Sequence, residues 1–296
     1  MHRYMSQPVL RFAPSPNGYL HLGHALSALE CQRWAQAVGG RLLLRIEDTD
    51  LSRARPQYVE AILDDLKWLG LTWEEPVRVQ SEHLDTYEAA LGALYDEGLA
   101  YPAPASRTQI ARALDGLKAE GIAWGSDPDG SPHYPFGDRD RADRPDEMPG
   151  DVPIRLDMQA ALEKLGVSKV AEKRIASPTS APVTTMTDPS VWGDILLRGR
   201  DRPATYHLAV VVDDADQGVT HVVRGLDLEP STSVQRLLQE LLGLPAPIYH
   251  HHRLILGEDG RKLSKSEGAK SLRSVRRTGI ERNALIAQLL ATPPSQ

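Results

Sequence analysis

Two histidines three residues apart, His21 and His24, are the strongest chemical feature of this 296-residue sequence. They follow a proline-rich turn and Gly18, at the start of a helix-like apolar pattern, so we expect both on one face of a first helical turn. There they can donate to phosphate oxygens, helped by unpaired backbone N–H groups and the helix dipole, and Gly23 allows a nucleotide close to the backbone. Two ordinary surface histidines or a metal-binding pair are the alternatives, although no third ligand lies nearby in sequence.

Lys262 and Lys265 form the second feature, on a serine-containing segment after the turn Gly257–Gly260. Two lysines at this spacing can stabilise charge on a transferring phosphate, whereas an exposed basic loop is the commoner meaning of such a segment alone. From Arg261 to the end, eight basic and two acidic residues give a local charge of +6, against −6 for the whole chain. A basic end on an acidic body indicates an anionic partner such as phosphate or nucleic acid, or else a solvated basic helix.

Composition narrows the class of protein. Hydrophobic residues make up 41% and charged residues 25%, which is ordinary for a globular chain long enough to bury a core. The apolar runs are far shorter than the roughly 20 residues of a membrane span, and the start of the chain lacks the apolar core of a signal peptide. The single cysteine, Cys31, excludes an internal disulfide framework and a cysteine-rich zinc site. We expect a cytoplasmic protein without membrane association and, from its length, a monomer.

The elements that position these residues begin with a strand at Val9–Ala13, a helix at Leu22–Val38 and a strand at Arg41–Glu47. This β-α-β unit favours a parallel sheet with a right-handed crossover. The proline-rich stretch Ser126–Pro153 indicates an inserted subdomain. Further helices are predicted over Tyr58–Leu69, Leu84–Glu97 and Ser233–Leu242, and further strands over Tyr206–Asp214 and Val219–Gly225.

Ligands of such sheets bind at the carboxyl ends of the strands, where the strand order switches. This places Ala13–His24, Glu47 and Arg224 near one crevice. Asp213 and Asp214 end a predicted apolar strand, where a turn and a contact with substrate are equally good interpretations. We expect an α/β fold with a discontinuous Rossmann catalytic domain (residues 1–98 and 188–245), an insertion (99–187), and a lysine loop with a helical end (246–296).

Two segments resemble the ATP-binding signatures of class I aminoacyl-tRNA synthetases: RFAPSPNGYLHLGH at Arg11–His24 and KLSKS at Lys262–Ser266. The resemblance covers most of residues 9–268 and implies a Rossmann-type parallel sheet with an inserted, acceptor-binding-like α+β subdomain. Three further segments are similar to the glutamyl branch of that class, namely Arg45–Asp50, Leu69–Trp73 and Ala209–Leu228.

Two departures resemble the truncated paralogues called glutamyl-Q tRNA(Asp) synthetases. Only 31 residues follow Lys265, too few for an anticodon-binding domain, and Ala25–Leu29 lacks the Arg-Thr of full-length glutamyl enzymes. The resemblance implies a ligase that activates L-glutamate with ATP and transfers it to the queuosine base of tRNA(Asp), with a short helical C-terminal region contacting the stem. The alternatives are a glutamyl-tRNA synthetase-like enzyme that charges a 3′ end, an inactive binding paralogue, and a nucleotidyltransferase resembling pantothenate synthetase.

The resemblance also implies residue roles. Arg11 and Arg224 would hold substrate carboxylates, Glu47 the ammonium group, and Tyr206 would close the pocket. The full glutamate-binding set is Arg11, Phe12, Ala13, Pro14, Ser15, Glu47, Tyr206 and Arg224. ATP would be bound by His21, Gly23, His24, Lys262 and Lys265, with Mg²⁺ bridging its phosphates and with His21, His24 and Lys265 as the catalytic groups.

Many members of this paralogue family bind zinc in the insertion through a Cys-x-Cys pair and a Tyr-x3-Cys motif. Here Ala103, Ala105 and Asp138 stand at the cysteine positions, and only Tyr134 is retained. Because three thiolates are missing, we predict no structural zinc and an insertion held by apolar packing and its prolines. The run His250–His252 allows a metal hypothesis, but a place on the approach to the lysine loop is the preferred interpretation.

Overall fold

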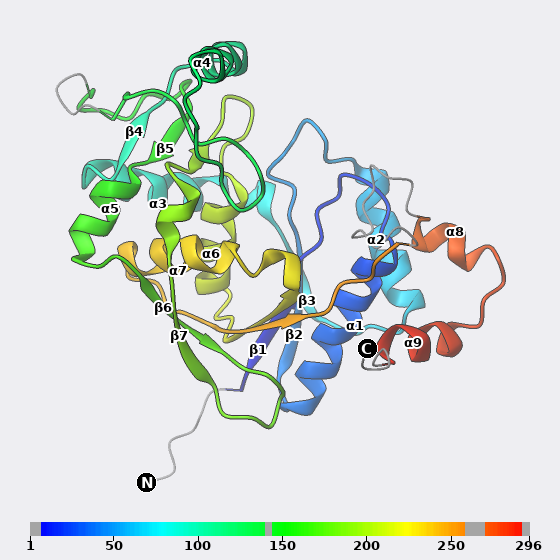
Figure 1. Ribbon diagram of the computed structural model, residues 1–296. Helices are drawn as coiled ribbons and strands as arrows, with labels where there is room; N and C mark the ends of the chain where they lie inside the picture. The colour runs from blue at the N-terminus through cyan, green and yellow to red at the C-terminus, as the bar shows by residue number, and fades with distance from the viewer. Residues whose placement is uncertain (1–6, 140–143, 258–269, 292–296) are drawn as a thin grey trace, which may run out of the picture.

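The computed structural model describes residues 7–139, 144–257 and 270–291, and a parallel sheet lies at its centre (Figure 1). The first three strands pair in parallel in the order β1-β2-β3. The strands are β1 (Val9–Phe12), β2 (Arg41–Ile46) and β3 (Glu74–Val79), and the helices that connect them are α1 (Leu22–Ala37) and α2 (Pro56–Trp68). The predicted β-α-β unit is therefore confirmed, and each of its elements ends one residue earlier than predicted.

A second sheet continues the first. Its order is β7-β6-β10-β9, with β6, β10 and β9 parallel and β7 antiparallel at the edge. The Thr220 N–H, just before β9, donates to the Val9 carbonyl of β1 at 2.9 Å, so β9 lies beside β1. The strands span β6 (Val170–Arg174), β7 (Val183–Thr187), β9 (His221–Gly225) and β10 (Ile248–His252). The strand order thus switches between β1 and β9, where open α/β sheets bind ligands.

The third sheet is antiparallel, in the order β4-β5-β8, and belongs to the lobe that carries α4 in Figure 1. Its elements are β4 (Ala100–Pro102), α4 (Arg107–Ala119), β5 (Ile154–Leu156), α5 (Met158–Leu165) and β8 (Leu196–Arg198). The predicted α/β class is confirmed. The strands β6 and β7 lie inside the range 99–187 yet join the second sheet, and β8 lies outside that range yet pairs with β5. The chain thus passes between the second and third sheets within the predicted ranges, and the domain limits stay a prediction.

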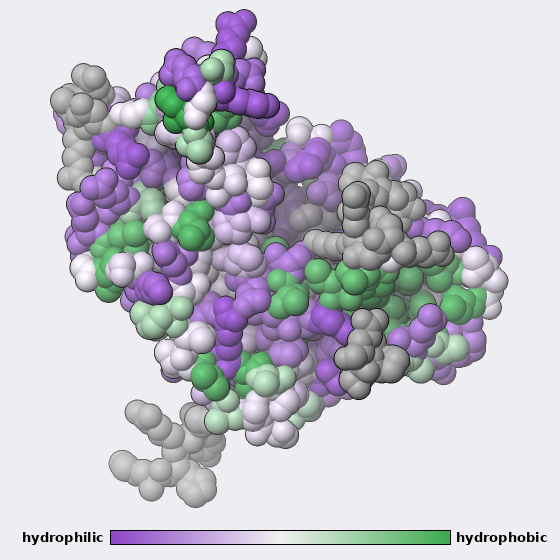
Figure 2. All heavy atoms as spheres, viewed as in Figure 1, coloured by the Kyte–Doolittle hydropathy of each residue, from purple (hydrophilic) through white to green (hydrophobic). Residues whose placement is uncertain are grey.

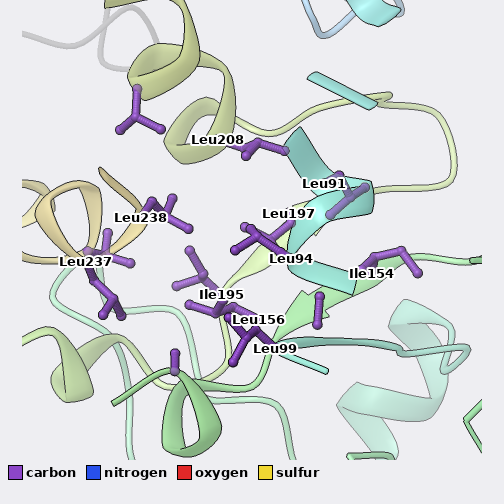
Figure 3. Close-up of a cluster of buried hydrophobic side chains, with 14 of the residues drawn as sticks. Leu91, Leu94, Leu99, Ile154, Leu156, Ile195, Leu197, Leu208, Leu237 and Leu238 are labelled. Atoms are coloured by element: carbon purple, nitrogen blue, oxygen red, sulfur yellow. The ribbon is translucent and has the colours of Figure 1, made fainter. Parts of the chain in front are cut away.

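One large apolar cluster joins this lobe to the helices beside the second sheet (Figure 3). Leu91 and Leu94 of α3 (Leu84–Asp96) face Ile154 and Leu156 of the antiparallel sheet, and Leu237 and Leu238 come from α7 (Ser231–Leu241). All of these side chains are buried, so the lobe is packed onto the rest of the chain through a shared core.

The segment Tyr206–Asp214 was predicted to be a strand, and this prediction is wrong. The segment forms α6 (Tyr206–Asp216), whose residues Leu208 to Asp214 are all buried. α6 packs against α3 and α7, so it is covered on several sides. A helix that is buried all round shows no amphipathic period, and its three consecutive valines then read as a strand.

Short 3-10 turns and two C-terminal helices complete the described chain. The turns are η1 (Gln80–Glu82), η3 (Pro189–Trp192) and η4 (Leu226–Leu228), and the helices are α8 (Leu272–Arg276) and α9 (Arg282–Leu290). α9 packs against α1. Arg276 pairs with Asp64 and Asp65 of α2 at 2.6 and 2.7 Å, which anchors α8. No helix among the described residues is long and apolar enough to cross a bilayer.

Candidate active site

A cleft of about 670 Å³ opens where β1, β2 and β9 end. Figure 2 shows the surface hollowed between the lobe with α4 and the part with α2 and α8. The cleft is lined by every described residue that the sequence analysis assigned to glutamate or ATP: Arg11, Phe12, Ala13, Pro14, Ser15, His21, Gly23, His24, Glu47, Tyr206 and Arg224. Lys262 and Lys265 lie outside the described residues, so their roles stay predictions.

The two histidines begin α1. His21 is the N-cap residue, and its Nδ1 accepts the Gly23 N–H, while Nδ1 of His24 accepts the His21 N–H, both at 3.1 Å. Because each Nδ1 is an acceptor, a neutral ring carries its proton on Nε2. The ring centroids lie 3.8 Å apart at the cleft wall, with the two ring planes tilted by 41°. Two N–H groups that we expected to be unpaired are therefore capped by the histidines, which leaves the Nε2–H groups as the ring donors.

Gly23 is required by its neighbour. A Cβ atom at this position would lie 2.9 Å from Cε1 of His21, closer than side chains approach. Gly23 also lines the cleft, and its expected role of admitting a nucleotide close to the backbone stays a prediction. The glycine thus allows His21 to cap the helix and to face the cleft.

The described residues on both sides of the segment 258–269 lie at this site. His252, Arg253, Leu254 and Ile255 line the cleft, and the Leu272 N–H donates to the Leu20 carbonyl at 2.6 Å, next to the histidine turn. The described residues before the predicted lysine segment therefore line the cleft, and those after it lie beside the start of α1.

A buried ion network holds Arg11. Its Nε donates to Oδ1 of Asp214 at 2.9 Å, and the same oxygen accepts Nη1 of Arg45 at 2.7 Å. Nη2 of Arg45 then reaches Oε1 of Glu47 at 3.1 Å. Burial alone would raise the pKa of Asp214, but the charges of Arg11 and Arg45 outweigh it and hold that pKa below its usual value. One carboxylate therefore positions the predicted carboxylate-binding arginine and, through Arg45, the predicted ammonium-binding glutamate.

The neighbouring Asp213 extends the network toward β3. Its carboxylate accepts Arg78 Nε, Gln80 Nε2 and the Tyr87 hydroxyl, at 2.7, 2.7 and 2.8 Å. Buried charges of this kind are tolerated only when paired and hydrogen-bonded. The three arginines Arg11, Arg45 and Arg78 thus each have a buried carboxylate partner, among Asp213, Asp214 and Glu47, and Arg78 also pairs with the more exposed Asp216. Neither a turn nor a substrate contact describes the aspartate pair: both aspartates are buried anchors within α6.

Glu47 keeps one oxygen for the cleft. Arg45 occupies Oε1, and the Glu47 N–H donates to the Pro14 carbonyl at 3.0 Å, which fixes the backbone. Burial raises the pKa of Glu47, and the nearby charges of Arg45 and Arg11 offset this only in part. A second cation beside the carboxylate, such as a substrate ammonium group, would stabilise its ionised form.

Arg224, at the end of β9, is 4% exposed and is surrounded by uncharged acceptors. Its Nη1 donates to Oε1 of Gln235 at 2.7 Å and its Nη2 to Oγ1 of Thr232 at 2.7 Å. Nε reaches Nε2 of His251 at 3.2 Å, and the Tyr206 hydroxyl lies 3.5 Å from Nη1. Both predicted carboxylate-binding arginines are therefore held rigidly, one by a carboxylate and the other by neutral groups.

The stretch where the related family carries zinc is filled by side chains. Tyr101, Ala103 and Tyr134 form a small buried cluster, and Arg155 stacks over the Tyr134 ring at 4.4 Å. The Tyr134 hydroxyl donates to Asp138, so the retained tyrosine bonds to the residue that stands at the last cysteine position. Apolar packing does hold this part of the lobe, as predicted. Throughout 7–139, 144–257 and 270–291, no three His, Cys, Asp or Glu side chains gather as a metal site, the run at 250–252 included.

Sequence reasoning missed the residues that hold the two arginines. Asp214 and Arg45 support Arg11, and Thr232, Gln235 and His251 support Arg224. The aspartate pair was noticed but placed on a strand. A helical interpretation of 206–216 would have directed attention to acidic side chains within a buried segment.

Comparisons with known proteins agree with this geometry. Residues 8–292 match the family described as tRNA synthetases class I (E and Q), catalytic domain. A glutamyl-Q tRNA(Asp) synthetase of Rhodobacter capsulatus is 43% identical over 92% of this chain and 95% of its own length. A glutamate–tRNA ligase of Nitratidesulfovibrio vulgaris is 37% identical over 97% of this chain but only 57% of its own.

A solved structure shows the same arrangement. A glutamate tRNA ligase from Elizabethkingia meningosepticum, crystallised in complex with its amino acid, superimposes with a TM-score of 0.67 at 28% identity, over 89% of this chain and 53% of that one. The family match spans the cleft and all the described site residues. The chain thus belongs to the class I aminoacyl-tRNA synthetases of the glutamyl type, within the glutamyl-Q tRNA(Asp) synthetase family of ligases.

Proposed function

We propose that this protein activates L-glutamate with ATP and transfers it to the queuosine base of tRNA(Asp). The observation that carries the proposal is the single cleft in which Arg11, Arg224 and Glu47 lie beside His21 and His24. Two guanidinium groups and one carboxylate complement the two carboxylates and one ammonium group of glutamate. Family membership supplies the reaction class.

The first step is attack of the glutamate α-carboxylate on the ATP α-phosphate, with pyrophosphate as the leaving group. The nucleophile is already ionised, so the protein has to align the reactants and stabilise charge on the phosphates. The Nε2–H groups of His21 and His24, at the start of α1, are the donors that we assign to the phosphates. Lys265, with help from Lys262, is assigned to the leaving pyrophosphate.

Mg²⁺ would offset the negative charge of the ATP phosphates. At nucleotides this ion takes most of its ligands from phosphate oxygens and water, so one or two nearby carboxylates suffice. Asp227 lines the cleft and could supply such a carboxylate. We propose no further metal or zinc for this chain.

In the second step a hydroxyl group of the queuosine cyclopentene ring attacks the glutamyl carbonyl, and AMP leaves. The likeness to a glutamyl-Q tRNA(Asp) synthetase, 43% identical over 92% of this chain, supports this acceptor. Lys270, Arg273 and Arg277, all exposed around α8, are candidates for contacts with tRNA phosphates. Arg276 is excluded from that role because Asp64 and Asp65 hold it.

The test uses labelled glutamate, ATP and three RNAs: tRNA(Asp) with queuosine, the same tRNA with guanosine at that position, and tRNA(Glu). A fourth sample, queuosine-bearing tRNA(Asp) without its 3′-terminal adenosine, locates the label. We expect labelling of both queuosine-bearing RNAs and of no other. Labelling of tRNA(Glu), lost when its 3′ adenosine is removed, would instead establish 3′ charging, and no glutamate-dependent use of ATP with any RNA would establish an inactive paralogue.

A further inference from the structure

The positive charge of Arg224 is not balanced by the residues around it. The three groups that accept its strongest hydrogen bonds are an amide, a hydroxyl and an imidazole, from Gln235, Thr232 and His251. None of the ion pairs within 7–139, 144–257 and 270–291 includes Arg224, although it is 4% exposed. Buried guanidinium groups are normally paired with a carboxylate, as Arg11 is with Asp214.

The acceptors around Arg224 are themselves fixed and uncharged. Thr232 and Gln235 lie on the first turns of α7 and are 0% and 2% exposed. Burial and the neighbouring Arg224 charge lower the pKa of His251 to about 3, so its ring is neutral and can accept from Arg224 Nε. These three residues therefore orient the Arg224 guanidinium group but do not neutralise its positive charge.

The charge of the site then matches the charge of one substrate class. Arg11, Arg45 and Arg78 each have a carboxylate partner, among Asp213, Asp214, Asp216 and Glu47, whereas no ion pair of the described residues includes Arg224. Glutamate carries a net charge of −1 and glutamine carries none, although the two differ by only one polar group. A site with one unmatched buried cation favours glutamate, because glutamine leaves that cation unpaired.

We propose that Thr232, Gln235 and His251 are specificity-determining residues, which orient Arg224 while leaving its charge for the substrate and so select glutamate over glutamine. The inference rests on the proposed activation of glutamate. It assigns the discrimination to the uncharged character of the residues behind the arginine as well as to the arginine itself. A carboxylate at any of these three positions would form an ion pair with Arg224 and neutralise its charge before a substrate binds.

Gln235→Glu tests the proposal, because it keeps the size and the acceptor position and adds one negative charge. ATP–pyrophosphate exchange is measured with glutamate and with glutamine, in the presence of tRNA(Asp). We expect the ratio of kcat/KM for glutamate to that for glutamine to fall by at least about 100-fold, the scale on which buried charge pairs act. Thr232→Asp, which places a carboxylate beside Nη2, should lower the same ratio and provides a second route if Gln235→Glu does not fold.

Two controls separate charge from structure. Gln239→Glu adds the same charge one turn further along α7, where Gln239 contacts Arg236 and Tyr249 and not Arg224; its ratio should stay within about 3-fold of the wild type. Gln235→Met removes the acceptor without adding charge, so both substrates should lose activity while their ratio stays within about 5-fold. An unchanged ratio in folded Gln235→Glu and Thr232→Asp proteins, or a loss in Gln235→Met as large as in Gln235→Glu, would overturn the inference. Absence of glutamate-dependent exchange in the wild type would instead refute the proposed function.

Discussion

Replacing Asp214 by asparagine should weaken both glutamate binding and the fold, because this one carboxylate faces two buried guanidinium groups. Its Oδ1 lies 2.9 Å from Arg11 Nε and 2.7 Å from Arg45 Nη1, and its side chain is 5% exposed. Asparagine keeps the shape but removes the charge. Breaking a buried ion pair from one side costs about 3–5 kcal/mol, because the remaining charges stay buried without compensation.

For a chain of this length, a cost of that size lowers the unfolding midpoint by about 5–8 °C. The effect on function comes from Arg11, which loses the bond that aims it at the cleft, so the KM for glutamate should rise by about 10–100-fold. The KM for ATP should change by less than about 3-fold, because hydrogen bonds within the histidine turn itself, from the Gly23 and His21 N–H groups to the two Nδ1 atoms, position these rings.

Asp216→Asn is the matched control. Asp216 lies two residues further along α6 and pairs with Arg78 at 2.6 Å, but its side chain is 54% exposed. Exposed ion pairs contribute at most about 1 kcal/mol, so the midpoint should fall by less than about 2 °C with no change in KM. Thermal unfolding followed by circular dichroism and pyrophosphate exchange at varied glutamate concentration measure both effects. If Asp214→Asn behaved like Asp216→Asn, the positioning role of the network would be refuted.

Three further outcomes follow from the structure. Because we predict no structural zinc, a metal chelator should leave the unfolding midpoint within about 1 °C, and a large chelator effect would show a structural metal. Tyr134→Ala should cost about 3 kcal/mol, because the Tyr134 ring is buried in an apolar cluster. Burial and the charge of Arg224 lower the pKa of His207 to about 4, so between pH 6.5 and pH 4 the unfolded chain binds more protons than the folded chain. As the pH falls through this range, the free energy of unfolding should therefore decrease by up to about 1.4 kcal/mol per pH unit. His207→Asn should flatten this slope in urea titrations at several pH values. Affinity for tRNA should fall with salt, and the double change Arg273→Ala and Arg277→Ala should reduce the slope of log K against log salt by about 2; an unaltered slope would remove α8 from the RNA interface.

The residues at the carboxyl ends of the strands could be predicted from the sequence because the local patterns there are strong. A short apolar strand, a proline turn and a helical repeat predict β1 and α1, and the helix start places His21 and His24 together. The general rule for parallel sheets then brings Glu47 and Arg224 to the same edge. Their placement in one cleft required no knowledge of distant contacts.

The failure at Tyr206–Asp214 has a physical cause. Periodicity reports which face of an element meets water, and α6 has no such face over Leu208 to Asp214. β-branched valines then favour a strand by propensity, while packing against α3 and α7 stabilises a helix. The error misplaced Asp214, which was interpreted as a turn residue or a substrate contact at a strand end and is instead a buried residue within α6.

Residue type also could not distinguish the two arginines of the site. Arg11 and Arg224 are both buried, both lie near the carboxyl end of a strand, and both were assigned to substrate carboxylates. The two arginines differ in their hydrogen-bond partners, which are not their neighbours in sequence. Gln235 is 11 residues from Arg224, and Asp214 is 203 residues from Arg11. Arg11 is paired with the Asp214 carboxylate, whereas no ion pair of the described residues includes Arg224, so the charge of Arg224 is the one available to a substrate. The selectivity of such a pocket is therefore a property of the groups behind its arginines, and substitutions in those groups should change the preferred substrate while the arginines stay in place.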